Sequence, residues 1–324
     1  MGKHLSGSKT PNSEAHQDHS LAISSTGQLF GWGKNQFGQL GLGETEWIPQ
    51  PTLIPLPFSV KQAAAQFRHT LVLSVDGRSL FGFGECSHGQ LGPLLHEQGS
   101  RQPVLPNPSQ IPRPRIPLMK NKRKVRSISV KRPARQQNQP IDLLEHLPDH
   151  HGLRGTAILS IATGMRHSVL LDMNGNAWGI GDNRFGQICS PKGEKMNVPV
   201  RMERSRLFLS VHAGWNFTAL EGSKKTHLLL RGRNNYGQLG SPEDVEVNLL
   251  DFPSPISQVA SGSEHCGVLL GDGSVYLWGW NEHGQLGNGT IANSSSPCPL
   301  PLPSPATFLS SGSAQCFVST LNEL

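Results

Sequence analysis

Four histidines recur at matching places in the chain and are the first candidates for chemistry. They precede glycines 27, 77, 175 and 273 by eight residues each, and they are His19, His69, His167 and His265. Clustered imidazoles could bind a metal ion or act as a general base. These four instead occur once per segment of roughly 50 residues, and Asn216 and Gln315 replace His in two further segments. A hydrogen-bonding role tolerates such replacements, so we expect the histidines to tie neighbouring segments together.

Other groupings that could perform chemistry are weaker. His146, Asp149, His150 and His151 lie close together beside a Pro-rich stretch, where we expect a solvated loop and no metal site. The five cysteines include no C-x-x-C pair, and the chain contains no H-E-x-x-H, G-x-S-x-G or phosphate-cradling G-x-x-x-x-G-K-S/T motif. We therefore predict no catalytic residue, metal or cofactor, and we expect a binding protein that is not an enzyme.

One basic segment dominates the charge of the chain. The formal net charge is +6, but residues 101–141 contain eleven Lys and Arg and no Asp or Glu, so the remainder carries 6 − 11 = −5. A nuclear-import signal, a phosphate-binding patch and a solvated loop all remain open for this segment. Residues 101–140 contain no aromatic ring, so any contact with nucleic acid would be weak and independent of sequence. The basic cluster comprises Lys120, Lys122, Arg123, Lys124, Arg126, Lys131, Arg132 and Arg135.

An internal repeat predicts the architecture that holds these residues. The form G-x-[N/C]-x-[F/Y/H]-G-Q-[L/I] occurs five times, at a period close to 50 except for one gap of 97 residues. We assign its glycines to unusual backbone angles and its glutamine to the turn backbone, which makes the motif structural. Its first Gly, second Gly and Gln are Gly33, Gly38 and Gln39; Gly84, Gly89 and Gln90; Gly181, Gly186 and Gln187; Gly232, Gly237 and Gln238; and Gly279, Gly284 and Gln285.

Each repeat also predicts a β-hairpin. Short apolar runs such as 20–23 and 28–32 flank a Thr-Gly, Asp-Gly or Asn-Gly pair, whose Gly accepts the positive φ of a tight turn. A period near 50 with several short strands indicates propeller blades. The fold class is therefore an all-β propeller with five repeats and a half repeat at residues 308–321, which is an incomplete ring.

The repeat boundaries divide the chain into four parts. Residues 1–13 form an N-terminal tail, 14–92 carry repeats 1 and 2, and 153–324 carry repeats 3 to 5 and the half repeat. Residues 93–152 are expected to be a basic, Pro-rich, disordered insertion between two blades, because residues 100–151 contain no Gly and the segment holds ten of the 25 Pro. No complement to the half repeat precedes residue 14, so we expect an abbreviated chain. No stretch approaches the length of a membrane span or resembles a signal peptide.

The repeated motif resembles the regulator of chromosome condensation (RCC) repeat, over residues 14–92 and 156–324. Residues 262–265 with 278–284 look most like the group of secretion-regulating guanine nucleotide exchange factors. The resemblance implies a seven-bladed propeller that binds a protein partner, either a small GTPase or a CSL-type zinc protein. It further implies a monomer of the cytoplasm and nucleus. The alternative is a nuclear, chromatin-associated protein whose basic insertion contacts DNA or binds an import receptor.

Overall fold

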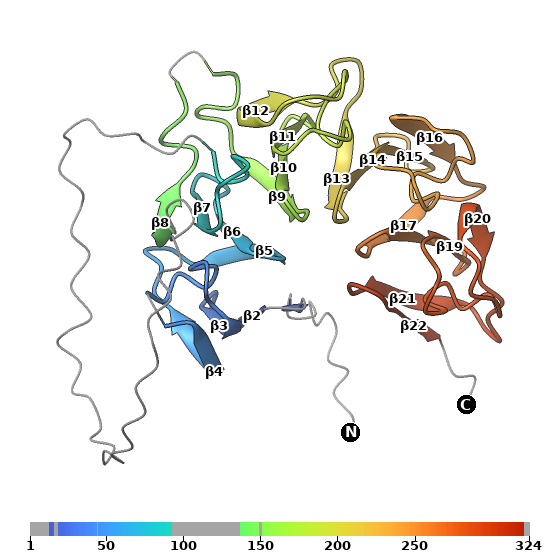
Figure 1. Ribbon diagram of the computed structural model, residues 1–324, viewed down its shortest axis with the longest axis horizontal. Helices are drawn as coiled ribbons and strands as arrows, with labels where there is room; N and C mark the ends of the chain where they lie inside the picture. The colour runs from blue at the N-terminus through green and yellow to red at the C-terminus, as the bar shows by residue number, and fades with distance from the viewer. Residues whose placement is uncertain (1–12, 16–18, 44, 93–136, 149–150, 321–324) are drawn as a thin grey trace, which may run out of the picture. The chain divides into compact units, whose positions relative to one another are not determined.

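The computed structural model describes residues 13–15, 19–43, 45–92, 137–148 and 151–320. None of the described residues is helical, and none belongs to a helix that could cross a membrane. The strands form five four-stranded antiparallel sheets and one two-stranded sheet, which we name blades 1 to 5 and the half blade (Figure 1). These correspond to the five repeats and the half repeat predicted above, and they confirm the propeller fold class.

The first three blades are built from residues 13–201. Blade 1 comprises β1 (Ser13–Ala15), β2 (His19–Ile23), β3 (Leu29–Lys34) and β4 (Trp47–Ile54). Blade 2 comprises β5 (Val60–Gln66), β6 (His69–Ser74), β7 (Leu80–Gly84) and β8 (Gln137–Asp142). Blade 3 comprises β9 (Ile158–Thr163), β10 (His167–Asp172), β11 (Ala177–Gly181) and β12 (Met196–Arg201).

The remaining strands follow in the same order. Blade 4 comprises β13 (Phe208–Ala213), β14 (Phe217–Gly222), β15 (His227–Gly232) and β16 (Val247–Asp251). Blade 5 comprises β17 (Ile256–Ser261), β18 (His265–Leu270), β19 (Val275–Gly279) and β20 (Ser294–Pro299). The half blade comprises β21 (Ala306–Ser311) and β22 (Cys316–Thr320). Five full blades and one half blade are fewer than the seven that the family resemblance implies.

Blade 2 corrects the predicted position of the insertion. Strand β8 lies inside the segment 93–152 and pairs with β7, with Gly82 opposite Ile141. The insertion therefore interrupts blade 2 before its fourth strand and does not separate two blades. This strand is hard to detect in the sequence, because Gln137–Asp142 is largely polar and follows its Gly-Gln-Leu motif only after a long gap. Residues 94–135 lie outside the described residues.

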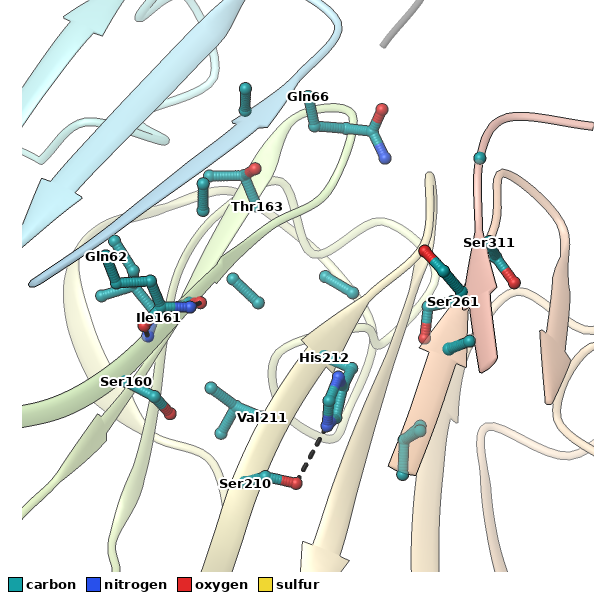
Figure 2. A pocket seen from close by; sticks show the side chains of 18 of the residues that line it. Gln62, Gln66, Ser160, Ile161, Thr163, Ser210, Val211, His212, Ser261 and Ser311 are labelled. Atoms are coloured by element: carbon teal, nitrogen blue, oxygen red, sulfur yellow. Dashed lines mark hydrogen bonds between the residues drawn. The ribbon is translucent and has the colours of Figure 1, made fainter. Parts of the chain in front are cut away.

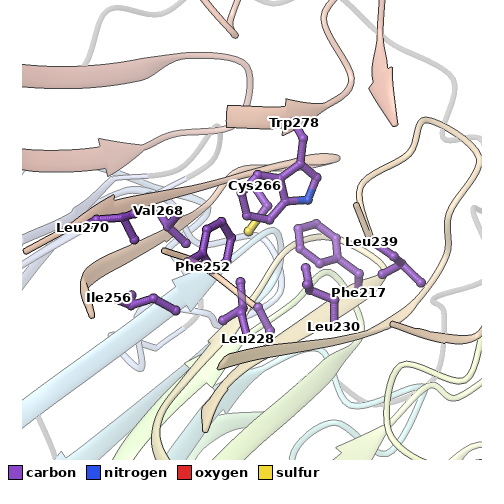
Figure 3. Packing of buried hydrophobic residues seen from close by; sticks show 11 residues of the cluster. Phe217, Leu228, Leu230, Leu239, Phe252, Ile256, Cys266, Val268, Leu270 and Trp278 are labelled. Carbon is purple, nitrogen blue, oxygen red and sulfur yellow. The ribbon is translucent and has the colours of Figure 1, made fainter. Parts of the chain in front are cut away.

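The hydrophobic core lies between consecutive blades. Figure 3 shows the cluster between blades 4 and 5, where Phe217 and Leu230 of blade 4 meet Cys266, Val268 and Trp278 of blade 5. Similar clusters join blades 1 and 2, blades 3 and 4, and blade 5 and the half blade. Because each apolar sheet face is covered by the next blade, the stability of one blade depends on its neighbours.

Candidate protein-binding face

The repeated motif forms a loop that is closed by its own side chains. In blade 1, the amide nitrogen of Asn35 donates to the carbonyl oxygens of Gly43 and Thr45, at 3.1 and 2.9 Å. Its Oδ1 accepts the backbone N–H of Leu40 at 2.8 Å. Asn183, Asn234 and Asn281 make equivalent bonds in blades 3, 4 and 5. The loop is therefore fixed in the same shape in these four blades.

The glutamine of the motif fixes the ring residue two positions before it. In blade 1, Gln39 Oε1 accepts the backbone N–H of Phe37 at 3.0 Å. The same bond recurs in the other blades at 2.9–3.0 Å, from His88 to Gln90, Phe185 to Gln187, Tyr236 to Gln238 and His283 to Gln285. Each blade thus presents one aromatic or imidazole ring from a rigid loop.

The first glycine of the motif brings a second loop close. Gly84 has φ +101°, and a Cβ there would lie 2.2 Å from the carbonyl oxygen of Arg68, which excludes any side chain. The next residue, Glu85, donates its N–H to that same oxygen at 2.9 Å. The equivalent bond in blade 5 joins Trp280 to Glu264. Two side chains per blade are therefore held beside the ring residues.

Three of the four predicted histidines form a relay between blades. The Nε2 atom of His167 lies 3.0 Å from the hydroxyl of Thr218 in the next blade. That hydroxyl donates to the carbonyl oxygen of Gln187 at 2.8 Å, so the imidazole is the donor. His19 with Thr70, and His69 with Ser168, repeat the arrangement at 2.8 and 3.1 Å. Burial lowers the pKa of His167 to about 4 and that of His69 to about 3, which keeps both rings neutral.

The histidine column departs from the prediction in blade 4. Phe217 pairs with Gly232, as His167 pairs with Gly181, so Phe217 and not Asn216 occupies the column. The Gly-x-x-His spacing of blades 3 and 5 is kept, with Gly214 packed against the ring of Phe217. His265 is followed in the half blade by Cys316 instead of a hydroxyl residue, and its ring nitrogens have no side-chain partner among the described residues.

Ring residues and their neighbours make arginine–aromatic contacts in two groups, one between blades 1 and 2 and one across blades 3 to 5. We call these residues together the arginine–aromatic belt and define it as Phe37, Arg68, Phe185, Arg233, Tyr236 and Trp280. The guanidinium of Arg68 lies 4.3 Å from the ring centre of Phe37 in the preceding blade. Arg233 lies 5.6 Å from both Phe185 and Tyr236, and Tyr236 lies 6.3 Å from Trp280. Each contact joins a fixed loop to its own or the next blade. Arginine and large aromatic side chains are the types that dominate protein-binding hot spots.

Carboxylates hold the arginines of the belt. Arg68 lies 3.5 Å from Glu85, and Arg233 lies 3.4 Å from Glu264. Glu264 is buried and also accepts hydrogen bonds from the amides of Asn216 and Gln238. Burial raises the pKa of Glu264, although its donors and Arg233 oppose that shift. The sequence contained a signal for the arginines and the carboxylates that hold them. Each of them stands directly after the first motif glycine or directly before the histidine column.

The remaining predicted sites add no chemistry to this face. His146 Nδ1 bonds to the carbonyl of Asp142 at 2.6 Å, and His151 Nε2 bonds to that of Pro199 at 2.8 Å. In the part of the chain that is described, no three His, Cys, Asp or Glu side chains are grouped as metal ligands would be. Asp149, His150 and the whole basic cluster lie outside the described residues.

Comparison with known proteins agrees with this geometry. The model of the RCC1-like domain matches residues 13–318. The secretion-regulating guanine nucleotide exchange factor of Bos taurus is 27% identical over 86% of this chain and 68% of its own length. The ultraviolet-B receptor UVR8 of Arabidopsis thaliana is 27% identical over 86% of this chain and 55% of its own length.

Solved structures share the fold. Human WBSCR16 superposes with a TM-score of 0.72 at 19% identity, over 95% of this chain and 71% of that protein. Prp20p of Saccharomyces cerevisiae superposes with a TM-score of 0.71 at 19% identity, over 96% of this chain and 69% of that protein. With the repeated loops, the blades and the domain match in agreement, the chain belongs to the RCC1-like family and is related to regulators of the guanine nucleotide exchange type.

Proposed function

We propose that the chain is a non-catalytic propeller that binds a small GTPase through the arginine–aromatic belt and promotes its nucleotide exchange. The observation that carries this proposal is the contrast between the loops and the residues they present. The loops are closed by the same hydrogen bonds in every full blade with the motif Asn, whereas the ring residue and its neighbour differ between blades. A rigid surface of varied side chains is suited to recognising one protein partner.

The relatives support a small GTPase as the class of partner. Two mammalian relatives at 27% and 28% identity are named guanine nucleotide exchange factors, and such factors act on GTPases. Exchange requires no bond-making residue, because the factor only has to bind the GTPase more tightly in its nucleotide-free state. The belt offers what that binding needs, since Arg68 and Arg233 are partly exposed and already oriented by stacking and by carboxylates.

The proposal is tested by the release of a fluorescent GDP analogue from a panel of purified small GTPases. The intact chain should accelerate release from one of them at least tenfold, and Arg233→Ala together with Tyr236→Ala should reduce that effect about 30-fold, as loss of a hot spot does. Arg206→Ala, an exposed arginine in the turn before β13, is the control and should leave the rate unchanged. Acceleration of no GTPase, with capture of a CSL-type zinc protein by the belt instead, would replace the exchange role by a scaffold role.

A nuclear role is the second candidate, and the basic cluster is the observation that favours it. The solved structures related in fold include Prp20p, described together with its binding to Gsp1p and histones, and yeast RCC1 bound to Kap60. We propose that the cluster directs part of the protein from the cytoplasm to the nucleus. Replacing Lys122, Arg123, Lys124 and Arg126 with Gln removes four charges and should deplete the nuclear pool without changing affinity at the belt. An unchanged distribution together with unchanged binding to heparin would assign the cluster to a solvated loop.

A further inference from the structure

A polar cavity of about 460 Å³ lies where the first strands of blades 2 to 5 and of the half blade meet (Figure 2). Its wall is made by β5, β9, β13, β17 and β21, with Ser160, Ser210 and His212 among the side chains that line it. The cavity is distinct from the arginine–aromatic belt. Its volume lies within the range of small-molecule sites, which is roughly 300–1,000 Å³.

Two glutamines show how the first strands of adjacent blades are joined. The carboxamide of Gln62 in β5 donates Nε2–H to the carbonyl of Ile161 in β9 at 2.8 Å and accepts the N–H of Ile161 at 3.0 Å. In blade 5, Gln258 Oε1 accepts the N–H of Leu309 in β21 at 2.7 Å. In both cases the glutamine carboxamide bonds to backbone groups of the first strand of the next blade. Those groups point away from the sheet to which that strand belongs.

This glutamine hydrogen bond is missing between blades 3 and 4 and between blades 4 and 5. The register places Ser160 and Ser210 at the position of Gln62 and Gln258. A serine side chain is too short to reach the next strand, and Ser160 Oγ is buried with no hydrogen-bond partner among the described residues. Figure 2 shows both serines on the cavity wall, together with Gln62 and Ile161.

The same register exposes two backbone edges to the cavity. Val211 pairs with Leu220 as Ile161 pairs with Leu170, so its N–H and C=O point away from β14, as those of Ile161 point away from β10. Val259 occupies the equivalent position in β17. Both valines line the cavity. Each edge therefore offers one donor and one acceptor side by side, in the arrangement that a glutamine carboxamide occupies at Ile161.

His212 adds an acceptor to this wall. Ser210 Oγ donates to Glu221 Oε2 at 2.7 Å and lies 2.9 Å from His212 Nε2. With Glu221 ionised, the single hydroxyl proton is used, so Nε2–H of His212 donates and Nδ1 is left as an acceptor. Burial lowers the pKa of His212 to about 4, which keeps the imidazole neutral at physiological pH.

We propose that the cavity binds a primary carboxamide, which pairs with the backbone of Val211 as Gln62 pairs with Ile161. Ser160 supplies a further hydrogen bond, and Val259 provides a second, weaker position. The ligand is a small molecule with a carboxamide group or the Asn or Gln side chain of a peptide. A carboxylate of the same shape is excluded, because it has no N–H to give to the carbonyl of Val211.

The test uses nicotinamide, with nicotinate as the matched probe that lacks the amide donor. In the intact ¹⁵N-labelled chain, nicotinamide should shift the backbone amide signals of Val211 and Val259, and nicotinate should bind at least about tenfold more weakly. Ser160→Gln supplies the carboxamide from the chain itself and should abolish the response of Val211 without unfolding the blade. Ser160→Ala leaves the edge open and should retain it. Gln62→Ser opens a new edge, so the amide of Ile161 should become responsive.

A peptide that carries a single Gln identifies the source of the carboxamide. Binding at least about tenfold tighter than nicotinamide would assign the site to a protein side chain, and the reverse order would assign it to a small molecule. Either order is consistent with the proposal. Equal binding of nicotinamide and nicotinate, an unchanged Val211 response in Ser160→Gln, or no response of either valine at about 50 mM nicotinamide would each overturn it.

Discussion

The relay between blades 3 and 4 allows one sharp test of how the propeller is held together. Thr218→Val keeps the shape of the side chain but removes the hydroxyl that joins His167 to the carbonyl of Gln187. All three residues are fully buried, so water cannot replace the lost bonds. A donor and an acceptor are both left unpaired.

The expected cost follows from these two groups. An unpaired buried polar group costs about 1–3 kcal/mol, so Thr218→Val should lower the free energy of unfolding by about 2–4 kcal/mol. Between blades 4 and 5 the chain has an apolar pair at the equivalent positions. Phe217 stands in the place of His167, and Cys266 stands in the place of Thr218. Adding His167→Phe to Thr218→Val removes the unpaired imidazole and should restore about 1–2 kcal/mol, leaving only the carbonyl of Gln187 unpaired.

The assay is urea unfolding at pH 8, followed by intrinsic fluorescence, with the wild type, both single variants and the double variant. At this pH the imidazole is neutral in the folded and unfolded chain, so no protonation change enters the cycle. The result that would refute the reasoning is a Thr218→Val variant within about 0.5 kcal/mol of the wild type, or a double variant less stable than Thr218→Val.

Three further predictions concern the same packing. Burial lowers the pKa of His69 to about 3 and that of His167 to about 4, so the unfolded chain takes up protons first as pH falls below about 6.5. Each histidine should cost about 2 kcal/mol of stability at pH 5, and urea titrations at pH 7.5 and 5 should show a smaller loss in His167→Phe. Gly279→Val should lower the melting temperature sharply, because φ is +102° and a Cβ would lie 2.6 Å from a backbone carbonyl, whereas Gly193→Ala meets nothing within 4 Å and should not. Glu264→Ala leaves three side-chain donors without their shared acceptor and should destabilise by about 2–4 kcal/mol in the same unfolding assay, with Glu264→Gln in between.

The fold could be predicted from the sequence because its signal is repeated five times. A glycine that must take a positive φ and a loop asparagine that must bond three backbone groups cannot be replaced freely, and so they remain visible at a fixed spacing. Strand β8 was missed for the opposite reason. It lies at the outer edge of blade 2 and needs only backbone pairing with β7, so its sequence carries no apolar alternation to detect.

The candidate site was predicted less completely, because its residues are defined by register. The sequence predicts Asn216 in the histidine column, but the strand register and the spacing from Gly214 select Phe217, which an apolar neighbour in Cys266 accommodates. The belt depends on contacts between loops of consecutive blades, such as Arg68 on Phe37. Such contacts cannot be read from either loop alone.

One physical cause explains why the repeat motif was visible in the sequence and the belt was not. The same cause bears on function. The hydrogen bonds that define the motif end within the loop or at the next blade, so the residues that make them serve to hold the scaffold. The recognition proposed above uses positions whose residue type varies between blades, such as Arg233, Tyr236 and Trp280 on the belt and Ser160 in the cavity. Because variable positions carry no repeat signal, a family assignment gives the scaffold, while the partner has to be found through the side chains that differ from blade to blade.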